Sequence, residues 1–349
     1  MFRSANVADG LAAPHNHFGL LRLLLALAVV VSHAVSVTTG HVTDEPLVAS
    51  TGFSLGEHAV NGFFGISGFL VTMSFAQRGW RDYVVARALR IAPGLIAATL
   101  VVSLLLGSAF TRMDLGAYLA DTELWRFIWR TLTTFKSSAP LPGVFQDNPL
   151  QFPMGTVWTL KYETICYGGV LALGLAGLLL NRRLALLVWA LLVVATIARE
   201  VVDAEGPKSV ETMLRLPLIF YTGGLIYLWR ERVPLSLAGL AVAMVLTALL
   251  SATPAYKAAL YVVTAWGVLV LAMAAVLTGW RSEPPADLSY GVYLYGWPIQ
   301  QSFVALFPTA AALTLFLPSL VVTVLVAAAS WYWVEKPALG LKRRLMGRR

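Results

Sequence analysis

Long apolar stretches separated by short polar segments occupy most of the chain. Each of them approaches the roughly 20 apolar residues with which an α-helix crosses a bilayer. They span residues 18–38, 59–76, 91–110, 157–180, 184–201, 214–229, 234–252, 258–279, 288–308 and 311–334. The pattern predicts an all-α polytopic membrane protein with about ten transmembrane helices.

The composition agrees with this fold class. Of the 349 residues, 58% are hydrophobic and 13% are charged, whereas soluble domains have roughly 45–50% and about 25%. Too few polar side chains remain to cover a water-soluble protein, which excludes a soluble enzyme and a disordered chain. The single cysteine, Cys166, excludes an intramolecular disulfide and a cysteine-based metal site, and we expect no bound metal.

The placement of the basic residues predicts the orientation. Lysine and arginine outnumber aspartate and glutamate by 26 to 18, a surplus that in a soluble protein would suggest a nucleic-acid partner. Here they gather on one side of the predicted spans, for example at residues 78–90, 182–183 and 336–349. Because basic loops stay in the cytoplasm, we expect both termini inside, a multi-pass protein of the cytoplasmic (inner) membrane, and no nucleic-acid partner.

The predicted organisation has one large domain. A cytoplasmic segment of residues 1–17 precedes the transmembrane domain of residues 18–336, and a basic cytoplasmic tail follows at residues 337–349. The longest segment between spans, residues 111–156, is predicted to lie on the outer side. A loop of this length more often has a function than serves only as a connector.

This predicted outer loop has two parts. From Asp114 to Phe135 apolar residues recur at helical spacing, and Trp125 and Trp129 lie one turn apart. These features predict an amphipathic helix at the membrane interface. The second part is expected to be irregular because prolines interrupt it. They are Pro140, Pro142, Pro149 and Pro153.

Two ionisable residues lie within the first apolar stretch. Arg22 and His33 are eleven positions apart, which places them about 20° apart around a helix and roughly 16 Å apart along it. Ionisable residues inside a span usually face a cavity or mark a site. Arg22 is near enough to the cytoplasmic end to extend its charge to the surface instead. His33 could equally be a neutral histidine bonded to another helix.

The second stretch is rich in small residues and leads into a group of arginines. Residues 62–68 include three glycines and Ser67, which allow a helix or a ligand to approach the backbone closely; tight packing alone would explain them. Arg87 and Arg90 share one helix face at the predicted cytoplasmic mouth. Guanidinium groups bind phosphates in a bidentate manner, although these arginines could simply anchor the topology.

The fourth stretch starts with Trp-Thr-Leu-Lys-Tyr-Glu, residues 158–163. Glu163 and Lys161 enter the membrane from the outer side at a depth that His33 could share. A carboxylate beside an imidazole orients the ring and stabilises its charged form, as a general base requires. Glu163 could also pair with Lys161 and have no further role.

Taken together, these segments resemble the acyltransferase-3 family of integral-membrane acyltransferases, from about Phe18 to Leu341. The resemblance rests on the spacing of Arg22 and His33 and on further motifs in this order. They are Phe-Phe-Gly-Ile-Ser-Gly-Phe-Leu (63–70), Arg-Ala-Leu-Arg-Ile-Ala-Pro (87–93), Trp-Thr-Leu-Lys-Tyr-Glu (158–163), Ser-Tyr-Gly-Val-Tyr-Leu (289–294) and Val-Glu-Lys-Pro (334–337). Many relatives have a histidine where this chain has Gly296, so a role for that histidine does not carry over.

The resemblance implies transfer of an acyl group, usually acetyl, from cytoplasmic acyl-coenzyme A to a hydroxyl of a carbohydrate. Such acceptors include surface or exported polysaccharides and lipid-linked glycans. We expect His33 to be the general base and Glu163 to orient it. Arg22, Arg87 and Arg90 would hold the phosphate-rich coenzyme A. The residues implied to bind substrate are Ser67, Trp158, Lys161 and Tyr293.

Two other functions remain open on the sequence. An acyltransferase for a small-molecule secondary metabolite would need the same residues. A non-enzymatic transporter would share the spans, the buried ionisable groups and the small-residue helix faces. Against a transporter, the two halves of the chain show no repeated hydropathy pattern.

Overall fold

The computed structural model describes residues 5–274 and 283–346. Within these ranges the secondary structure is helical, apart from two isolated β-bridges. Three sequence predictions extend beyond them: the first four residues of the N-terminal segment, the end of the stretch 258–279, and the last residues of the basic tail, 347–349.

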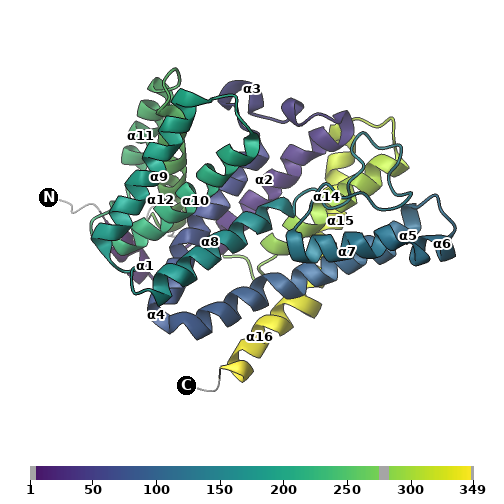
Figure 1. The fold of residues 1–349 in the computed structure, drawn as a ribbon, viewed down its shortest axis with the longest axis horizontal. Coiled ribbons are helices and arrows are strands. Elements are labelled where there is room, and N and C mark those ends of the chain that lie inside the picture. The colour runs from purple at the N-terminus through teal and green to yellow at the C-terminus, as the bar shows by residue number, and fades with distance from the viewer. Residues whose placement is uncertain (1–4, 275–282, 347–349) are drawn as a thin grey trace. The chain divides into compact units, whose positions relative to one another are not determined.

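Most of the helices are joined by short connections, and the longer irregular segment 135–157 joins α7 to α8 (Figure 1). In the first part of the chain they are α1 (Val7–Ala12), α2 (Phe18–Thr39), η1 (Val42–Asp44), α3 (Val48–Thr51), α4 (Leu55–Leu100), η2 (Val101–Leu106), α5 (Gly107–Phe110), α6 (Leu115–Ala120) and α7 (Thr122–Thr134). They continue with α8 (Trp158–Leu175), α9 (Arg182–Val202), α10 (Lys208–Leu228), α11 (Leu237–Leu249), α12 (Tyr256–Met273), α14 (Ser289–Leu306), α15 (Ala312–Ser330), η3 (Trp331–Glu335) and α16 (Lys336–Leu345). The predicted apolar stretches fall on these helices.

The predicted separation of the stretches 59–76 and 91–110 coincides with a break in the structure. The element α4 consists of two helices that meet at Gly79, whose φ of 78° and ψ of 174° are non-helical. A positive φ is easily adopted only by glycine, so the chain changes direction at this residue. The second of the two helices carries the arginine-rich segment and is extended by η2 and α5.

Five described helical segments are long and apolar enough to cross a membrane. They are Phe18–Thr39, Leu55–Phe110, Arg182–Val202, Tyr256–Met273 and Ala312–Leu345. Several apolar helices of this kind indicate a multi-pass membrane protein. The count of ten spans and the cytoplasmic location of both termini stay predictions.

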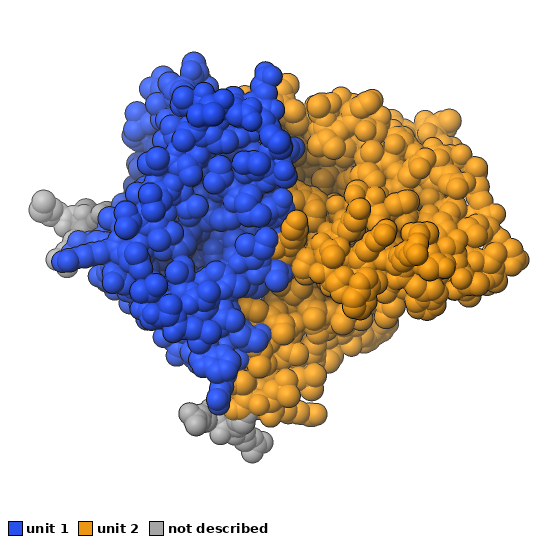
Figure 2. All heavy atoms as spheres, in the orientation of Figure 1, with its two compact units in different colours: residues 1–22, 61–84, 162–284 blue, residues 23–60, 85–161, 285–349 orange. Residues whose placement is uncertain are grey.

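The described chain divides into two compact units (Figure 2). The first unit comprises residues 1–22, 61–84 and 162–284, and the second comprises residues 23–60, 85–161 and 285–349. Helices α2, α4 and α8 each contribute residues to both units.

In the first unit, small residues of α4 allow neighbouring helices to pack closely. A Cβ added at Gly68 would lie 1.7 Å from the carbonyl oxygen of Phe220 in α10, and one at Gly65 would lie 3.0 Å from the Cα of Ala265 in α12. Neither backbone can move away without shifting a whole helix. Helix packing therefore accounts for these two glycines of the 62–68 segment.

In the second unit, an amphipathic helix covers part of the core. Leu124 and Phe127 of α7 are buried among residues of α4, α14 and the segment 139–157. Trp125 and Trp129 are exposed on another face, by 53% and 69%. Helix α7 thus has the amphipathic character that the tryptophan spacing predicts, and its apolar side is divided between the core and the surface.

Candidate active site

The candidate site of the second unit is built around the imidazole of His33 in α2. Its Nδ1 atom lies 3.0 Å from Oε1 of Glu45, a residue that follows the short helix η1. The Glu45 side chain is fully buried, whereas 21% of the His33 side chain is exposed. Because a carboxylate accepts the proton of Nδ1–H, Glu45 favours the tautomer in which Nε2 carries a free lone pair.

Glu45 is held in place by serine hydroxyls from the same face of α2. Ser36 donates a hydrogen bond to Oε1 at 2.6 Å, and Ser32 donates one to Oε2 at 2.5 Å. The oxygen of Ser32 in turn accepts from the backbone N–H of Gly56 at 2.9 Å, so its own proton is directed at Glu45. Each buried polar group of this set therefore has a partner, as a buried charge requires.

These contacts keep the Glu45 carboxylate ionised. Burial acts to raise its pKa, but the hydrogen bond and charge of His33 and the hydroxyls of Ser32 and Ser36 outweigh it and lower the pKa from 4.5 to about 2. A carboxylate that stays negative stabilises the imidazolium formed when His33 takes a proton. The pair therefore has the chemistry of a general base and its orienting group.

The other side of the imidazole is fixed by an aromatic cluster. Trp297 of α14 meets the His33 ring edge-to-face, with 4.9 Å between ring centroids. The indole stacks on Phe152 at 5.2 Å and donates a hydrogen bond from Nε1 to the Phe152 carbonyl oxygen at 2.8 Å. A Cβ at Gly155 would lie 2.4 Å from the indole, so the bare backbone of this glycine makes room for Trp297.

The irregular segment that carries Phe152 is anchored along α14. Asn148 donates to the backbone and side-chain oxygens of Gln301 at 2.9 and 2.7 Å, and Gln301 donates back to the Leu150 carbonyl oxygen at 2.8 Å. Buried hydrogen bonds of this kind restrict a loop that has no secondary structure of its own. The loop therefore forms a fixed wall beside the His33 site.

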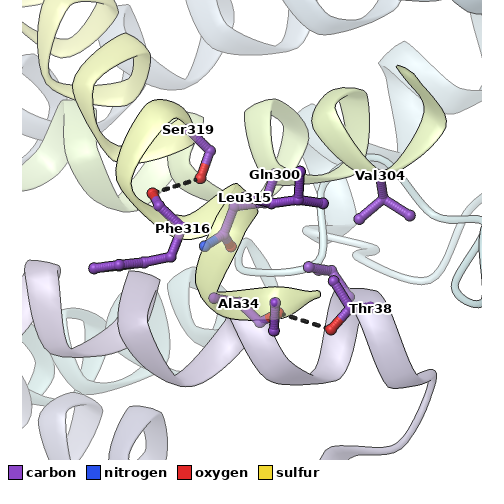
Figure 3. Close-up of a pocket in the computed structure, with 9 residues that line it drawn as sticks. Ala34, Thr38, Gln300, Val304, Leu315, Phe316 and Ser319 are labelled. Carbon is purple, nitrogen blue, oxygen red and sulfur yellow. Dashed lines mark hydrogen bonds between the residues drawn. The ribbon is translucent and has the colours of Figure 1, made fainter. Parts of the chain in front are cut away.

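A narrow apolar slot lies next to this wall, between α2, α14 and α15 (Figure 3). Thr38 donates its proton to the Ala34 carbonyl oxygen, and Ser319 donates its proton to that of Phe316. Gln300 uses its side-chain N–H to bridge to the Val30 carbonyl oxygen at 2.8 Å. The polar groups of the slot therefore serve helix packing, and the slot presents no nucleophile or base.

The carboxylate of Glu163 lies in the first unit and has its own partners. Tyr167 donates a hydrogen bond to Glu163 Oε1, and the Ser67 hydroxyl lies 3.4 Å from the same oxygen. Ser67 and Tyr167 are also 3.2 Å apart. Ser67 and Glu163, both singled out from the sequence, are thus brought together. The carboxylate found 3.0 Å from His33 is that of Glu45, and the orienting role expected of Glu163 stays a prediction.

The two arginines expected at the donor end occupy the second unit. Arg90 is ion-paired with Asp287, with 2.9 Å between NH2 and Oδ2, and its guanidinium lies 5.6 Å from the centre of the Tyr290 ring. Arg87, one turn earlier on α4, is also partly buried. A phosphate that binds Arg90 must therefore compete with Asp287 or share the guanidinium with it.

The remaining candidates are placed as follows. Arg22 is partly buried on α2, Trp158 is partly buried and Lys161 is exposed at the start of α8. The hydroxyl of Tyr293 lies 2.6 Å from Thr159 Oγ1 and donates to the Thr156 carbonyl oxygen at 2.9 Å. Tyr293 therefore ties α14 to the start of α8, and the substrate contacts expected of these residues stay predictions.

Comparison with known proteins identifies the family to which the chain belongs. Residues 16–332 match the acyltransferase domain family. The chain belongs to this acyltransferase family. It is 29% identical to nodulation protein 10 of Rhizobium leguminosarum bv. viciae, over 96% of each chain, and 27% identical to an O-acetyl transferase of Shigella phage Sf6, over 92% of this chain and 95% of the relative. No solved structure matches the chain.

Membership identifies the chain as an enzyme, a transferase of acyl groups other than aminoacyl groups, and sets the transporter alternative aside. Helix α14 packs closely on α2 at Gly296. A Cβ at this position would lie 2.7 Å from Cγ2 of Val30 in α2, so a larger residue here would require the Val30 side chain to move.

Sequence reasoning missed the two side chains that contact the His33 ring. Neither Glu45 nor Trp297 is among the residues singled out from the sequence. The sequence contains one indication of such a residue. Ser32 and Ser36 lie on the same helix face as the intramembrane His33, and buried hydroxyl groups are nearly always hydrogen-bonded to a polar partner. Among the described residues of the acyltransferase, no cluster of three metal-ligating side chains occurs.

Proposed function

We propose that this acyltransferase moves an acetyl group from acetyl-coenzyme A to a hydroxyl of a carbohydrate, with His33 as the general base. The observation that carries the proposal is the contact between His33 Nδ1 and the buried Glu45 carboxylate. It directs the free lone pair to Nε2, the nitrogen on the far side of the ring. The O-acetyl transferase name of one relative supports oxygen as the acceptor atom.

The reaction follows from this arrangement. Nε2 of His33 removes the proton of the acceptor hydroxyl as its oxygen attacks the thioester carbonyl carbon, and the carbon–sulfur bond breaks. The proton then passes from the imidazolium to the leaving coenzyme A thiolate, which regenerates the neutral ring. Glu45 stabilises the imidazolium between these steps, and Trp297 restrains the ring so that Nε2 keeps one direction.

Arginine side chains are proposed to hold the donor. Arg87 and Arg90 share one face of α4, and Arg22 lies on the same helix as His33. The nucleotide end of coenzyme A carries several phosphate charges, for which guanidinium groups are suited. The donor would enter from the cytoplasmic side, and the acceptor hydroxyl would reach His33 from the opposite side.

The acceptor class is proposed to be a glycan rather than a small secondary metabolite. The long segment 111–156 forms a packed surface of helices and loop beside the His33 site instead of a simple connection. Such a surface suits an extended acceptor that contacts the protein at more than one place.

A transfer assay tests the proposed function. Purified full-length protein in lipid nanodiscs is incubated with acetyl-coenzyme A labelled in the acetyl group and with a panel of glycans and hydroxylated small molecules. Label is expected in ester linkage on a glycan, at a rate that depends on His33. Label confined to small-molecule metabolites, or found on amines, would contradict the proposal.

Removing the donor arginines is expected to weaken coenzyme A binding. The double variant Arg87→Ala/Arg90→Ala should raise the dissociation constant about 10- to 100-fold at low salt, because hydrogen bonds to charged groups contribute about 1.5–3 kcal/mol. The difference should shrink as salt screens the charges. Titration calorimetry with coenzyme A at low and high salt measures this effect.

Two further variants sharpen the donor test. Arg81→Ala removes an exposed arginine of the same helix and should leave the affinity unchanged. Asp287→Asn keeps Arg90 but removes the charge that competes for it, so coenzyme A should bind more tightly. Equal affinity of the wild type and the double variant at low salt would disprove the donor assignment.

A further inference from the structure

A second cavity of the second unit lies on helix α7, away from the residues used for transfer. Its volume is about 190 Å³, which is the size of one monosaccharide rather than of an oligosaccharide. The walls come from α7, from its N-cap and from the first turn of the irregular segment. They are formed by Asp121, Glu123, Phe127, Arg130, Ala139, Pro140, Leu141 and Pro142.

The position of the cavity follows from two opposite faces of α7. Glu123, Phe127 and Arg130 are spaced four and three residues apart and therefore lie on one face, which lines the cavity. Trp125 and Trp129 lie on a different, exposed face, where aromatic side chains suit the membrane interface. A helix anchored in this way holds the cavity beside the lipid headgroups rather than within the hydrocarbon.

The ion pairs of the cavity can be replaced by hydrogen bonds to a ligand at a small cost in free energy. Glu123 forms ion pairs with Arg126 and, at 3.9 Å, with Arg130, and all three side chains are about half exposed. Exposed ion pairs of this kind contribute little to stability. Asp121 accepts from the Glu123 backbone N–H through Oδ1 at 2.8 Å, which leaves its second oxygen available as an acceptor.

The charge of the lining selects the class of ligand. The carboxylates of Asp121 and Glu123 are balanced by the guanidinium groups of Arg126 and Arg130, so the cavity offers no excess of positive charge to a phosphate or an acidic sugar. Carboxylates accept hydrogen bonds from hydroxyl groups and the guanidinium donates them, and both are stronger than bonds between neutral groups. Proline, leucine and phenylalanine side chains complete the walls with apolar surface, which suits the C–H face of a sugar ring.

The cavity is connected to the His33 site by a continuous, packed segment. Leu141 lines the cavity and packs in the same core as Leu294 and Ile299 of α14. Further along the segment, Phe152 stacks on Trp297, which contacts His33. The segment that lines the cavity therefore also carries the residues that position Trp297 against the imidazole.

From this placement we propose that the α7 cavity is a binding subsite for a neutral sugar unit of the acceptor glycan. The inference rests on the proposed function, because it names the acceptor that the His33 site would acylate. The subsite binds a sugar other than the one that reacts, and it raises the affinity for a glycan over that for a single hydroxyl compound.

The test uses a double variant that keeps the local fold. Asp121→Asn retains a residue suited to the N-cap, and Glu123→Gln retains the shape of the side chain, so Asp121→Asn/Glu123→Gln removes only the acceptor charges. Asp147→Asn is the matched control, because Asp147 is an exposed carboxylate of the same segment that is paired with Arg112. Saturation-transfer NMR is recorded from full-length protein in nanodiscs to methyl glycosides of neutral hexoses and to a methyl glucuronide.

The expected result is saturation transfer from the wild type and from Asp147→Asn to at least one neutral glycoside, with apparent affinity at least tenfold lower in the double variant. His33→Gln should bind the glycoside normally, so that loss of transfer and loss of sugar binding are separated. The double variant should still bind coenzyme A with the wild-type affinity, because the donor arginines are unchanged.

Three results would contradict the assignment of the α7 cavity as a sugar-binding subsite. They are equal binding by the wild type and the double variant, preferential binding of the glucuronide, and no saturation transfer from the wild type to any neutral glycoside. If the wild type binds the sugar through Asp121 and Glu123 but transfers no acetyl group to any glycan, the subsite stands and the proposed function fails.

Discussion

Replacing His33 by glutamine is expected to lower kcat for acetyl transfer by about 10²–10⁴-fold, the range for loss of a general base. Glutamine keeps a polar side chain beside Glu45 and Trp297 but has no basic nitrogen. The KM for acetyl-coenzyme A should change little, because the donor arginines remain. Initial rates with labelled acetyl-coenzyme A, measured over a series of donor concentrations, separate the two constants.

The control for this variant is His41→Gln, which changes an exposed histidine shortly after the end of α2. It should transfer acetyl groups at the wild-type rate. Thermal unfolding of His33→Gln in the same detergent checks that the fold is intact. A folded His33→Gln protein with wild-type kcat would show that another group takes the acceptor proton.

Replacing Glu45 by glutamine is expected to lower the maximal rate by about 10- to 100-fold, measured as initial rates with labelled acetyl-coenzyme A. The rate falls because the imidazolium formed during the reaction loses a charge-assisted hydrogen bond of about 1.5–3 kcal/mol.

The same carboxylate also links stability to pH. Since the pKa of Glu45 is lowered from 4.5 to about 2 in the folded protein, its contribution is fully present above pH 4.5 and is lost as the pH falls toward 2. Glu45→Gln should unfold with a weaker pH dependence in this window. Asp44→Asn, which changes the exposed neighbour, should leave both the transfer rate and the pH dependence of unfolding unchanged; a loss of rate with this control would contradict the assignment.

The helices could be predicted from the sequence because each apolar stretch carries its own signal. Hydropathy indicated α2, α9 and α15 without any knowledge of their neighbours. It also separated the two helices of α4, but it did not place the break at Gly79, because a single glycine does not distinguish a turn from a helix. Nor did it indicate that the arginine-rich segment is helical, since a group of charges has the same composition in a loop and in a helix.

Site residues that share a helix could be predicted from the sequence, whereas contacts formed where the chain folds back could not. Periodicity placed His33 and Arg22 on one face of α2, and Ser67 and Glu163 were both recognised as candidates. The carboxylate beside His33 depends on the course of the chain between α2 and α4, which brings Glu45 back to the side chains of Ser32 and Ser36. The depth of a residue along a span can be predicted from the sequence, but the residue that it contacts across a turn cannot.

The central claim is that Glu45 holds a proton on His33 Nδ1 and leaves Nε2 as the base. Nitrogen-15 NMR of full-length protein labelled at histidine, in nanodiscs, measures this directly when the His33 signals are assigned by their loss in His33→Gln. The expected spectrum has a one-bond proton correlation at Nδ1 and an unprotonated Nε2 signal, and the Nδ1 correlation changes in Glu45→Gln. A proton on Nε2 of the neutral ring would contradict the account, because that nitrogen could not then accept the proton of the acceptor hydroxyl.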